Sequence, residues 1–315
     1  MRVVITGGSG FIGTNLTRWF ADHEPDTEVV VLDTAVPQIA LPPSARYVYG
    51  DIRDVRCLVE AFRGADEVYN LAGILGTSEL IPLTRLAVEV NVGGAASVFD
   101  ACVLAGVPRV YNVAKPSFES LHENAYTLTK HGGELLGQLY REKFGLEVAT
   151  IRWLNAVGPY QHLYPVRKFV PTMILFALHD VDLEIYGSGA QTIDAIDTRD
   201  MCRYTVYACR NLGRDGRVHD LGSGVAISCN DAARLILGMV RYRFDTKSKL
   251  VHVPMRAGEA DDVQLVADMS FWEGLGMQPQ YGFEESIADC IGYIAHLPQH
   301  YQANALRFYG KEARR

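Results

Sequence analysis

The chain has 315 residues, which is more than one hydrophobic core comfortably organises and therefore favours two structural lobes. Hydrophobic residues make up 48% and charged residues 21%, as is typical of a globular protein, and the net charge of −7 comes without a basic run. A nucleic-acid partner is not expected, because binding one requires a positive stripe that neutralises phosphates.

The beginning of the chain and its cysteines point to a cytoplasmic protein. Met1 and Arg2 lead straight into an apolar strand, without the charged leader and long apolar region of a secretory signal. No run of about 18 apolar residues predicts a membrane span. None of the six cysteines forms a C-x-x-C pair, so we interpret them as reduced, buried thiols and expect no metal site.

The first half of the chain alternates short apolar strands with helices. The expected elements, in order, are a strand at 2–6, a glycine-rich turn at 7–13, a helix at 14–21, a strand at 28–32, a loop at 37–44, a strand at 47–49, a helix at 55–62, a strand at 67–71, a helix at 87–105, a strand at 109–113, a helix at 124–144 and a strand at 147–153. This alternation predicts βαβ crossovers, and hence an α/β fold with a doubly wound parallel sheet.

The alternation breaks after Asn155, where glycine and proline interrupt the pattern. We expect a first domain at 1–158, to which 190–222 returns with a helix at 200–211. A smaller C-terminal lobe would comprise 159–189 and 223–315. The polar tail after His300 is expected to be an exposed helix or a frayed end.

The turn after the first strand has the spacing of a phosphate-binding loop. Gly7, Gly10 and Gly13 form G-x-x-G-x-x-G between a strand and a helix, with Phe11 and Ile12 inside the motif. Glycines let a pyrophosphate approach the backbone, and the following helix directs free N–H groups at it. Asp33, twenty residues beyond Gly13, stands where a carboxylate accepts the ribose hydroxyls of NAD. The motif predicts a Rossmann-type fold that binds NAD.

Two neighbouring features refine the cofactor prediction. Thr34 and Ala35 follow Asp33 without an arginine, so a 2′-phosphate would meet a negative charge, which favours NAD over NADP. Asp51 and Ile52 follow the third strand. Asp51 either accepts from the adenine amino group or caps the next helix, and the sequence leaves both interpretations open.

Tyr126 and Lys130 form a candidate catalytic pair. The spacing i, i+4 places both on one face of a helix. A free phenol titrates near pH 10, so it can take a proton from an alcohol at neutral pH only if its phenolate is stabilised. Lys130 and the positive nicotinamide ring could both lower that pKa, by two or three units at an effective dielectric constant of about 20. A tyrosine and a lysine at this spacing are common by chance, and the NAD-binding turn upstream favours their interpretation as a catalytic pair.

Together these motifs resemble the extended short-chain dehydrogenase/reductase family, and within it the nucleotide-sugar epimerases and dehydratases. The resemblance runs from residue 1 to about 297. Its further motifs are Asp51-Ile52-Arg53-Asp54, Asn70-Leu71-Ala72-Gly73, Asn91-Val92-x-Gly94, 152–159, Pro254-x-Arg256-x-Gly258-Glu259 and Ala267-Asp268. The resemblance implies that Leu71, Ala72, Gly73 and Asn91 lie at the cofactor. It also implies substrate contacts at Thr77, Asn155, Gln191 and Arg256, and a homodimer formed through 87–105 and 124–144.

The chain departs from the family pattern at three places. Lys115 stands at the end of the fifth strand, where relatives carry Ser or Thr, and Tyr126 follows only eleven positions later. Ile193 replaces an arginine that binds phosphate in many relatives. Lys115 either takes over from the missing hydroxyl, offset by an acidic group on the substrate, or points elsewhere while Ser117 supplies the hydroxyl.

The resemblance favours a 4-epimerase that acts on a nucleotide-sugar through a transient 4-keto intermediate. A 4,6-dehydratase is the alternative, although dehydratases carry an Asp-Glu pair where Pro116 and Ser117 stand here. Glu119 could substitute for that pair. A non-catalytic NAD-binding scaffold is the third reading, and the intact Tyr126 and Lys130 argue against it.

Overall fold

The computed structural model describes residues 1–116, 124–259, 261 and 263–313. This part of the chain divides into two compact units. The first comprises Met1–Trp153 and Arg199–Leu221, and the second comprises Leu154–Thr198 and Gly222–Arg315. The expected boundaries at 158 and 190 differ from these bounds because the short strand at 155–157 pairs with the strand at 192–197 inside the second unit.

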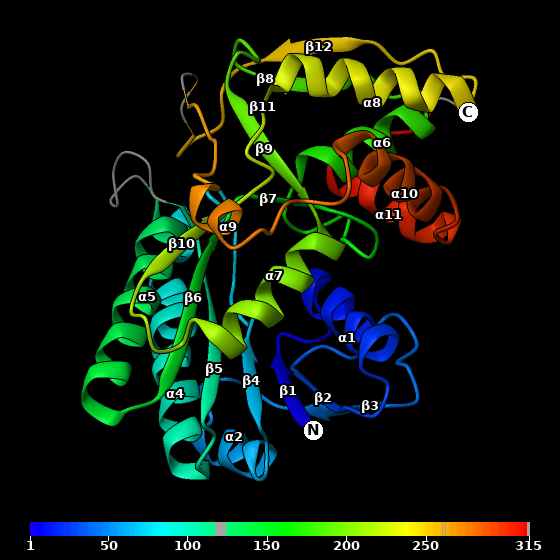
Figure 1. Ribbon diagram of the computed structural model, residues 1–315. Helices are drawn as coiled ribbons and strands as arrows, with labels where there is room; N and C mark the ends of the chain where they lie inside the picture. Colours follow the sequence, from blue (N-terminus) through cyan, green and yellow to red (C-terminus); the bar gives the residue numbers. More distant parts are fainter. Residues whose placement is uncertain (117–123, 260, 262, 314–315) are drawn as a thin grey trace. The chain divides into compact units, whose positions relative to one another are not determined.

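The first unit is built on a fully parallel sheet of seven described strands (Figure 1). Their spatial order is β3 (Ala45–Tyr49), β2 (Glu28–Asp33), β1 (Arg2–Thr6), β4 (Glu67–Asn70), β5 (Arg109–Ala114), β6 (Glu147–Trp153) and β10 (Val218–Leu221). The chain runs outward from β1 in one direction and then in the other from β4, so the sheet is doubly wound. The α/β, Rossmann-type prediction is confirmed.

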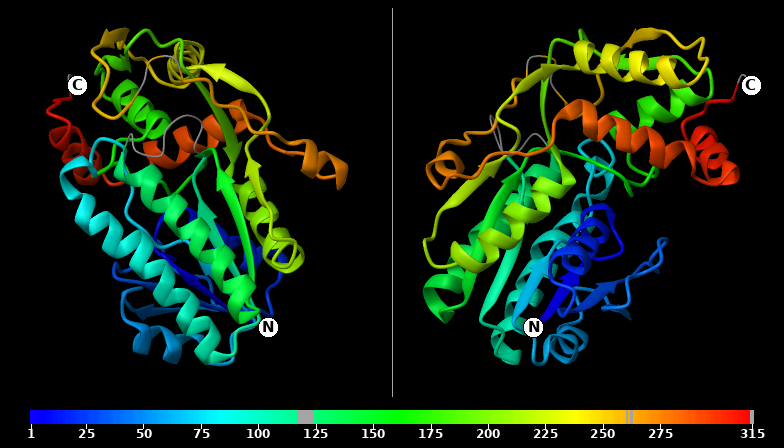
Figure 2. Two further views of the ribbon diagram at one scale, coloured as in Figure 1. Left: turned by 90° about the vertical axis from the view of Figure 1, so that its left-hand side faces the viewer. Right: turned by 45° about the vertical axis from the view of Figure 1, so that its right-hand side comes forward.

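Helices cover both faces of this sheet, as buried strands require. They are α1 (Phe11–His23), α2 (Val55–Phe62), α4 (Gly94–Ala105), α5 (Ala125–Phe144) and α7 (Thr198–Asn211). Alternate strand residues such as Val4, Val68 and Val110 pack against α2, α4 and α5. On the opposite face Tyr69 contacts Phe20 of α1. Figure 2 shows α4 and α5 side by side, in agreement with their contacts.

A long helical stretch precedes and includes α4. It contains η1 (Ile81–Leu83), α3 (Thr84–Ala87), the π-helical η2 (Val88–Gly93) and α4. Among the described helices this stretch, Ile81–Ala105, has the length and hydropathy of a membrane span. In the sequence this stretch is not a continuous apolar run, because polar residues such as Asn91 interrupt it. Val98 and Phe99 are fully buried in the core of the first unit, as in the core helix of a folded domain.

The second unit combines short strands with five described helices, four of which pack around its own core. Its elements are β7 (Asn155–Val157), α6 (Phe169–Leu178), β8 (Leu183–Tyr186), β9 (Thr192–Asp197), β11 (Ala226–Ser228), α8 (Cys229–Arg243), β12 (Leu250–Val253), α9 (Ser270–Gly274), α10 (Phe283–Ala295) and α11 (Gln299–Phe308). The core lies between α6, α8, α10 and α11. The tail after His300 is therefore a packed helix, with Ala305 and Leu306 buried, rather than an exposed or frayed end.

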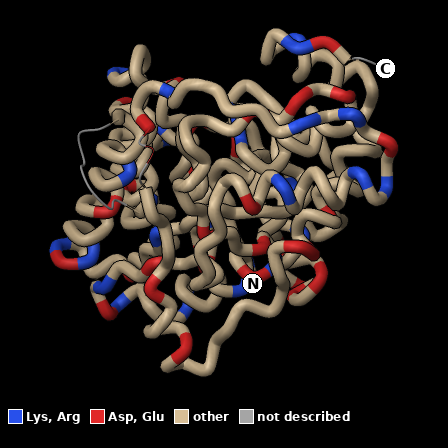
Figure 3. Tube along the Cα trace, turned by 90° about the horizontal axis from the view of Figure 1, so that it is seen from above, with Lys and Arg blue, Asp and Glu red and all other residues tan. Residues whose placement is uncertain are grey.

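Acidic and basic positions are interspersed along the trace (Figure 3). None of the six cysteines forms a disulfide bond within the described part of the chain, and five of them are buried. Burial raises the pKa of the Cys229 thiol to about 11, which keeps it protonated and unreactive at neutral pH.

Candidate active site

The glycine-rich turn joins β1 to α1 at the carboxyl edge of the sheet. Gly7 has a left-handed φ of 67°, and a methyl group added to it would stand 2.7 Å from the backbone nitrogen of Ala72. A methyl group on Gly13 would overlap the carbonyl oxygen of Gly7. Gly10 is the N-cap of α1 and provides no side-chain cap, so N–H groups of the first turn stay available. The turn is thus a cradle of closely packed backbone, in which side chains at Gly7 and Gly13 would not fit.

Ser9 adds a polar group that sequence reasoning missed. Its hydroxyl oxygen is buried and has no hydrogen-bond partner among the described residues. A buried hydroxyl without a partner costs free energy unless a ligand or water satisfies it. Its position inside the turn fits a phosphate oxygen, which would accept a hydrogen bond from it.

Asp33 stands at the end of β2, directly beside this turn. Its Oδ2 accepts a hydrogen bond of 3.0 Å from the backbone N–H of Ser9, and its Oδ1 accepts one of 2.9 Å from that of Ala35. The two bonds fix the carboxylate at the carboxyl edge of the sheet. This is the side on which doubly wound folds bind their ligands.

The structure shows whether Asp51 caps the next helix, which was one of its two interpretations. Asp54, not Asp51, caps α2, because its carboxylate accepts from the N–H groups of Arg56 and Cys57. Asp51 instead accepts from the backbone and the guanidinium of Arg53, which lowers the pKa of this carboxyl. The helix-cap interpretation of Asp51 is therefore wrong. The next residue, Ile52, is buried over Gly94, where a methyl group would overlap the isoleucine side chain.

A polar row crosses the middle of the sheet. Thr6, Asn70 and Asn112 occupy paired positions on β1, β4 and β5. Thr6 donates to Asn70, Asn70 donates to Asn112, and Asn112 donates to the carbonyl of Gly133 in α5, over distances of 2.9, 3.0 and 3.3 Å. The row ties α5 to three strands. In the sequence this row is signalled by polar residues at the ends of apolar strands. Of its three members, only Asn70 belongs to a motif from which the site was predicted.

Asn91 connects the loop after β4 to α5. Its side-chain amide exchanges two hydrogen bonds of 2.9 Å with the backbone of Ile74 and donates a third, of 3.0 Å, to Thr129. Asn91 lies within the π-helical segment, and such segments are frequent at functional sites. The loop that contains Leu71, Ala72 and Gly73 is thus held in place next to α5.

The start of α5 fixes Tyr126. The Asn124 side chain caps the helix by accepting from the N–H of Thr127 at 2.9 Å, a contact of about 1 kcal/mol. Farther along, Glu134 receives two hydrogen bonds from Arg152 of β6, of 2.9 and 2.6 Å. Both ends of the segment that carries Tyr126 and Lys130 are therefore anchored. Tyr126 is partly buried and packs against Leu80, Ala87 and Ala125.

Lys130 lies one helical turn beyond Tyr126 and is buried. A methyl group added to Gly73 would stand 3.2 Å from its Nζ, so the glycine leaves room beside the ammonium. Burial lowers the pKa of Lys130 to about 8 and raises the pKa of Tyr126 to about 12. The pKa of Tyr126 shifts in the direction opposite to the expected one, because burial among the protein's own residues disfavours the charged phenolate. Lowering this pKa requires added positive charge beside the phenol.

The remaining predicted residues are distributed over both units. Lys115 directly follows β5, and its ammonium donates to the carbonyl of Pro116 at 3.2 Å. Ser117 and Glu119 lie outside the described residues. Thr77 lies in the first unit, between β4 and η1, whereas Asn155, Gln191 and Arg256 belong to the second.

Gln191 and Arg256 share a neighbour in the second unit. The amide nitrogen of Gln191 donates to the carbonyl of Tyr186 at 2.8 Å, and the guanidinium of Arg256 lies 5.7 Å from the centre of the Tyr186 ring. Arg256 also pairs with Glu259 at 3.5 Å. The amide oxygen of Gln191 is buried and has no donor among the described residues, so it could accept from a ligand.

Comparison with known proteins agrees with this architecture. The low-salt glycan biosynthesis protein Agl12 of Haloferax volcanii is 29% identical over 314 residues, covering 93% of this chain and 98% of that protein. The crystal structure of the dTDP-glucose 4,6-dehydratase DesIV of Streptomyces venezuelae, bound to NAD, is 28% identical, with a TM-score of 0.81 and coverage of 94% and 98%. The epimerase Mth375 of Methanothermobacter thermautotrophicus shares the fold, with 24% identity, a TM-score of 0.85 and coverage of 93% and 92%.

The family model for the NAD dependent epimerase/dehydratase family matches residues 3–222. This range includes the glycine turn, Asp33, the polar row, Asn91 and the Tyr126/Lys130 pair. The cradle at the turn and the unpartnered Ser9 hydroxyl fit a dinucleotide phosphate, and NAD is the cofactor. The chain belongs to the NAD dependent epimerase/dehydratase family of extended short-chain dehydrogenases/reductases.

Proposed function

We propose that this protein is an epimerase that inverts the C4 hydroxyl of a nucleotide-sugar through a transient 4-keto intermediate. The observation that carries the proposal is the placement of Tyr126 and Lys130 one turn apart on an anchored helix, with Lys130 buried beside Gly73. Such a pair can take a proton from a sugar hydroxyl and return it. Bound NAD would supply reversible hydride transfer at the sugar carbon.

We propose that the chain holds NAD at the carboxyl edge of the first unit. The backbone of Gly7, Gly10, Phe11, Ile12 and Gly13 would bind the pyrophosphate, with help from the Ser9 hydroxyl. Asp33 would accept the ribose hydroxyls, and Asp51 and Ile52 would flank the adenine. Leu71, Ala72, Gly73 and Asn91 would line the nicotinamide side together with Tyr126 and Lys130.

The oxidised cofactor also explains how a phenol with a pKa near 12 could act as a base. Its positive ring and the Lys130 ammonium both favour the phenolate in a site of low polarity. Tyr126 would therefore become competent only in the NAD-loaded protein. On the substrate side, Thr77, Asn155, Gln191 and Arg256 remain the proposed contacts, and Arg256 suits a diphosphate because its guanidinium can form two parallel hydrogen bonds.

The residues after β5 favour epimerisation over dehydration. Removal of water needs an acid and a base in addition to Tyr126, and Pro116 stands where dehydratases carry the first of these carboxylates. Lys115 is proposed to hold the sugar oxygen in place of the usual hydroxyl. Wild-type turnover in a Lys115→Ala variant would contradict this role, and a loss confined to Ser117→Ala would transfer it to Ser117.

The experiment that tests the function incubates the purified, NAD-loaded protein with UDP-, dTDP- and GDP-hexoses and follows the products by mass spectrometry and proton NMR. A new isomer of unchanged mass is the expected result. A product lighter by one water molecule would identify a dehydratase, the activity named for DesIV, and would overturn the epimerase proposal. Turnover of no compound, with NAD still bound, would identify a scaffold.

We also propose that the protein is a cytoplasmic homodimer. Its six cysteines, which form no disulfide bond within the described residues, suit a reducing compartment. Side chains of Leu104 on α4 and of Leu135, Leu139 and Phe144 on α5 are 68%, 54%, 45% and 56% exposed. An apolar surface on two adjacent helices is suited to packing against the same surface of a second copy.

A further inference from the structure

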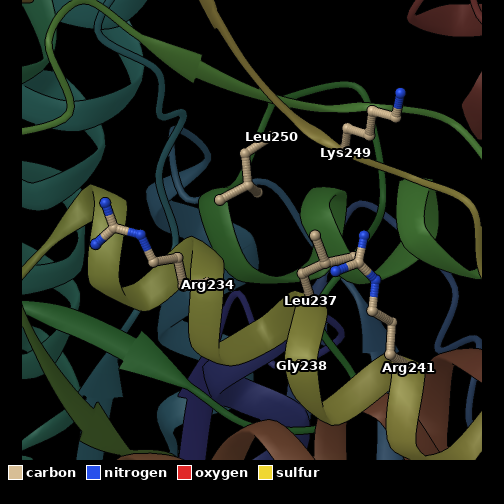
Figure 4. A pocket seen from close by; sticks show the side chains of 6 residues that line it. All are labelled: Arg234, Leu237, Gly238, Arg241, Lys249 and Leu250. Carbon is tan, nitrogen blue, oxygen red and sulfur yellow. The ribbon is translucent and has the colours of Figure 1, made fainter.

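The second unit contains a basic cavity that the proposed function does not use. It has a volume of about 290 Å³, and we call it the α8 pocket. Its lining is Arg234, Leu237, Gly238, Arg241, Lys249 and Leu250. None of these residues is among those proposed for NAD, for the nucleotide-sugar or for catalysis. Figure 4 shows the side chains of Arg234 and Arg241 on α8 and those of Lys249 and Leu250 from the segment that enters β12.

The helix places its two arginines at the two ends of the pocket. Arg234 and Arg241 are seven residues apart, which is two turns of α8, or about 10 Å along its axis. Leu237 and Gly238 lie between them. Lys249 approaches from the other side, since its backbone N–H is held by Asp182 at 3.0 Å just before β12 begins. Three cationic side chains therefore line the edge of a short apolar floor.

The cations of the pocket are only partly neutralised. Arg234 pairs with Asp231 at 2.6 Å. Arg241 donates to the carbonyl of Ser248 at 2.6 Å, a contact that orients its guanidinium and leaves its charge uncompensated. Within the part of the chain that the structure describes, neither Arg241 nor Lys249 forms an ion pair. Two positive charges that line the same pocket, on a protein of net charge −7, favour an anion at this place.

The floor of the pocket is apolar and is opened by a glycine. Leu237 is buried in the core of the second unit, and Leu250 packs against that core. A methyl group on Gly238 would meet no atom within 4 Å, so packing does not require a glycine there. Glycine inside a helix costs about 0.5–1 kcal/mol relative to alanine. At this position it keeps the floor low enough for a ring or a short carbon chain to lie against Leu237 and Leu250.

We propose that the α8 pocket binds a phosphorylated organic molecule of low molecular weight. The phosphate would lie between Arg241 and Lys249, where a guanidinium fork and an ammonium together match its two negative charges. The uncharged part would cover Leu237, Gly238 and Leu250, and Arg234 would take a second polar group at the far end. The volume suits a small molecule and is too small for a macromolecular segment.

Isothermal titration of the NAD-loaded protein tests this, with phenyl phosphate and inorganic phosphate as probes. The two probes carry the same charge and differ by an apolar ring. Phenyl phosphate is expected to bind several-fold more tightly than inorganic phosphate. The double variant Arg241→Gln/Lys249→Gln is expected to weaken both probes by at least about tenfold, which corresponds to about 1.4 kcal/mol.

Matched variants separate the pocket from general charge effects. Gly238→Leu is expected to remove the higher affinity for phenyl phosphate and to leave the affinity for inorganic phosphate unchanged. Arg243→Gln, which alters a cation of the same helix outside the lining, and Gly292→Ala, an open glycine in α10, should stay within about twofold of the parent. Equal affinity of the parent and the double variant, or no heat from either probe at millimolar concentration, would overturn the proposal. Unchanged melting temperatures are the check that each variant is folded.

Discussion

Gly73 leaves open the space next to the Lys130 ammonium. A methyl group at this position would stand 3.2 Å from Lys130 Nζ and 2.8 Å from the side-chain oxygen of Asn91. Gly73→Ala is therefore expected to displace the amide that holds Ile74 and to lower turnover by more than about tenfold, because a small misplacement of reacting groups is costly. Steady-state kinetics on a nucleotide-sugar substrate measure this.

The control for that prediction is Gly274→Ala in the second unit, where a methyl group meets no atom within 4 Å. It is expected to retain the parental rate. Parental turnover in Gly73→Ala would show that the loop tolerates a side chain beside Lys130.

Tyr126→Phe removes only the phenolic oxygen. Turnover is expected to fall by about 10²–10⁴, the usual contribution of a positioned acid or base. The ring still packs against Leu80, Ala87 and Ala125, so folding and NAD content should be retained. Bound NAD is measured by absorbance after denaturation. A variant as fast as the parent would refute the assignment of Tyr126 as the base.

Lys130 should make the cofactor-free protein less stable at neutral pH than at alkaline pH. Burial lowers its pKa from 10.5 to about 8, so the unfolded chain binds more protons than the folded protein between these values. The free energy of unfolding consequently rises with pH across this window. Below about pH 8 the full cost is present, amounting to about 3 kcal/mol at about 1.4 kcal/mol per pH unit.

Lys130→Met removes this cost. It is expected to raise the melting temperature of the NAD-free protein near neutral pH, with an advantage that shrinks towards about pH 10. The exposed Lys143, on the same helix, supplies the control Lys143→Met, for which no such pH trend is expected. An advantage that does not change with pH would show that the ammonium is not desolvated.

Asp33→Ala is expected to reduce the preference for NAD. The carboxylate would accept hydrogen bonds from the ribose hydroxyls of NAD and repel a 2′-phosphate. Its loss should therefore weaken the binding of NAD by about tenfold and reduce the difference in affinity between NAD and NADP. Fluorescence titration with both dinucleotides measures the ratio. The exposed Asp22 provides a charge-matched control, Asp22→Ala, whose ratio should equal that of the parent.

Leu135→Glu is expected to convert the proposed homodimer into monomers, because the charge would be buried against a second copy of α5. Light scattering after size-exclusion chromatography measures the mass. Leu275→Glu changes a leucine of similar exposure in the second unit and should leave the mass unaltered. A parent protein that is itself monomeric would contradict the proposal directly.

The sequence predicted the doubly wound sheet because each of its first six strands is a short apolar run bounded by a turn or a helix signal. It placed β6 at its observed bounds for this reason. It began α1 three residues late, at Thr14, since Gly10 as an N-cap looks like part of the turn. The second unit was not predictable at the same level, because β7 and β11 are three-residue strands that exist only through pairing with β9.

The candidate site was predictable where residue spacing along one element sets the geometry, as for Tyr126 and Lys130. It was not predictable where distant elements meet. The contact of Asn91 with Ile74 depends on a π-helical turn, and the pKa of Tyr126 depends on desolvation by surrounding side chains. Neither leaves a pattern in the local sequence.

The π-helical turn at Val88–Gly93 sets a limit on how this chain can vary in length. A π turn holds one residue more than an α turn, and each helical residue rotates the next by about 100°. Deleting one residue here would turn Asn91 and the preceding turns away from Ile74 while Val98 and Phe99 stayed in the core. Inserting one residue would rotate these turns in the opposite sense and would likewise remove the contact between Asn91 and Ile74. The register of this segment, and not only its composition, is thus a condition for placing the loop beside Lys130.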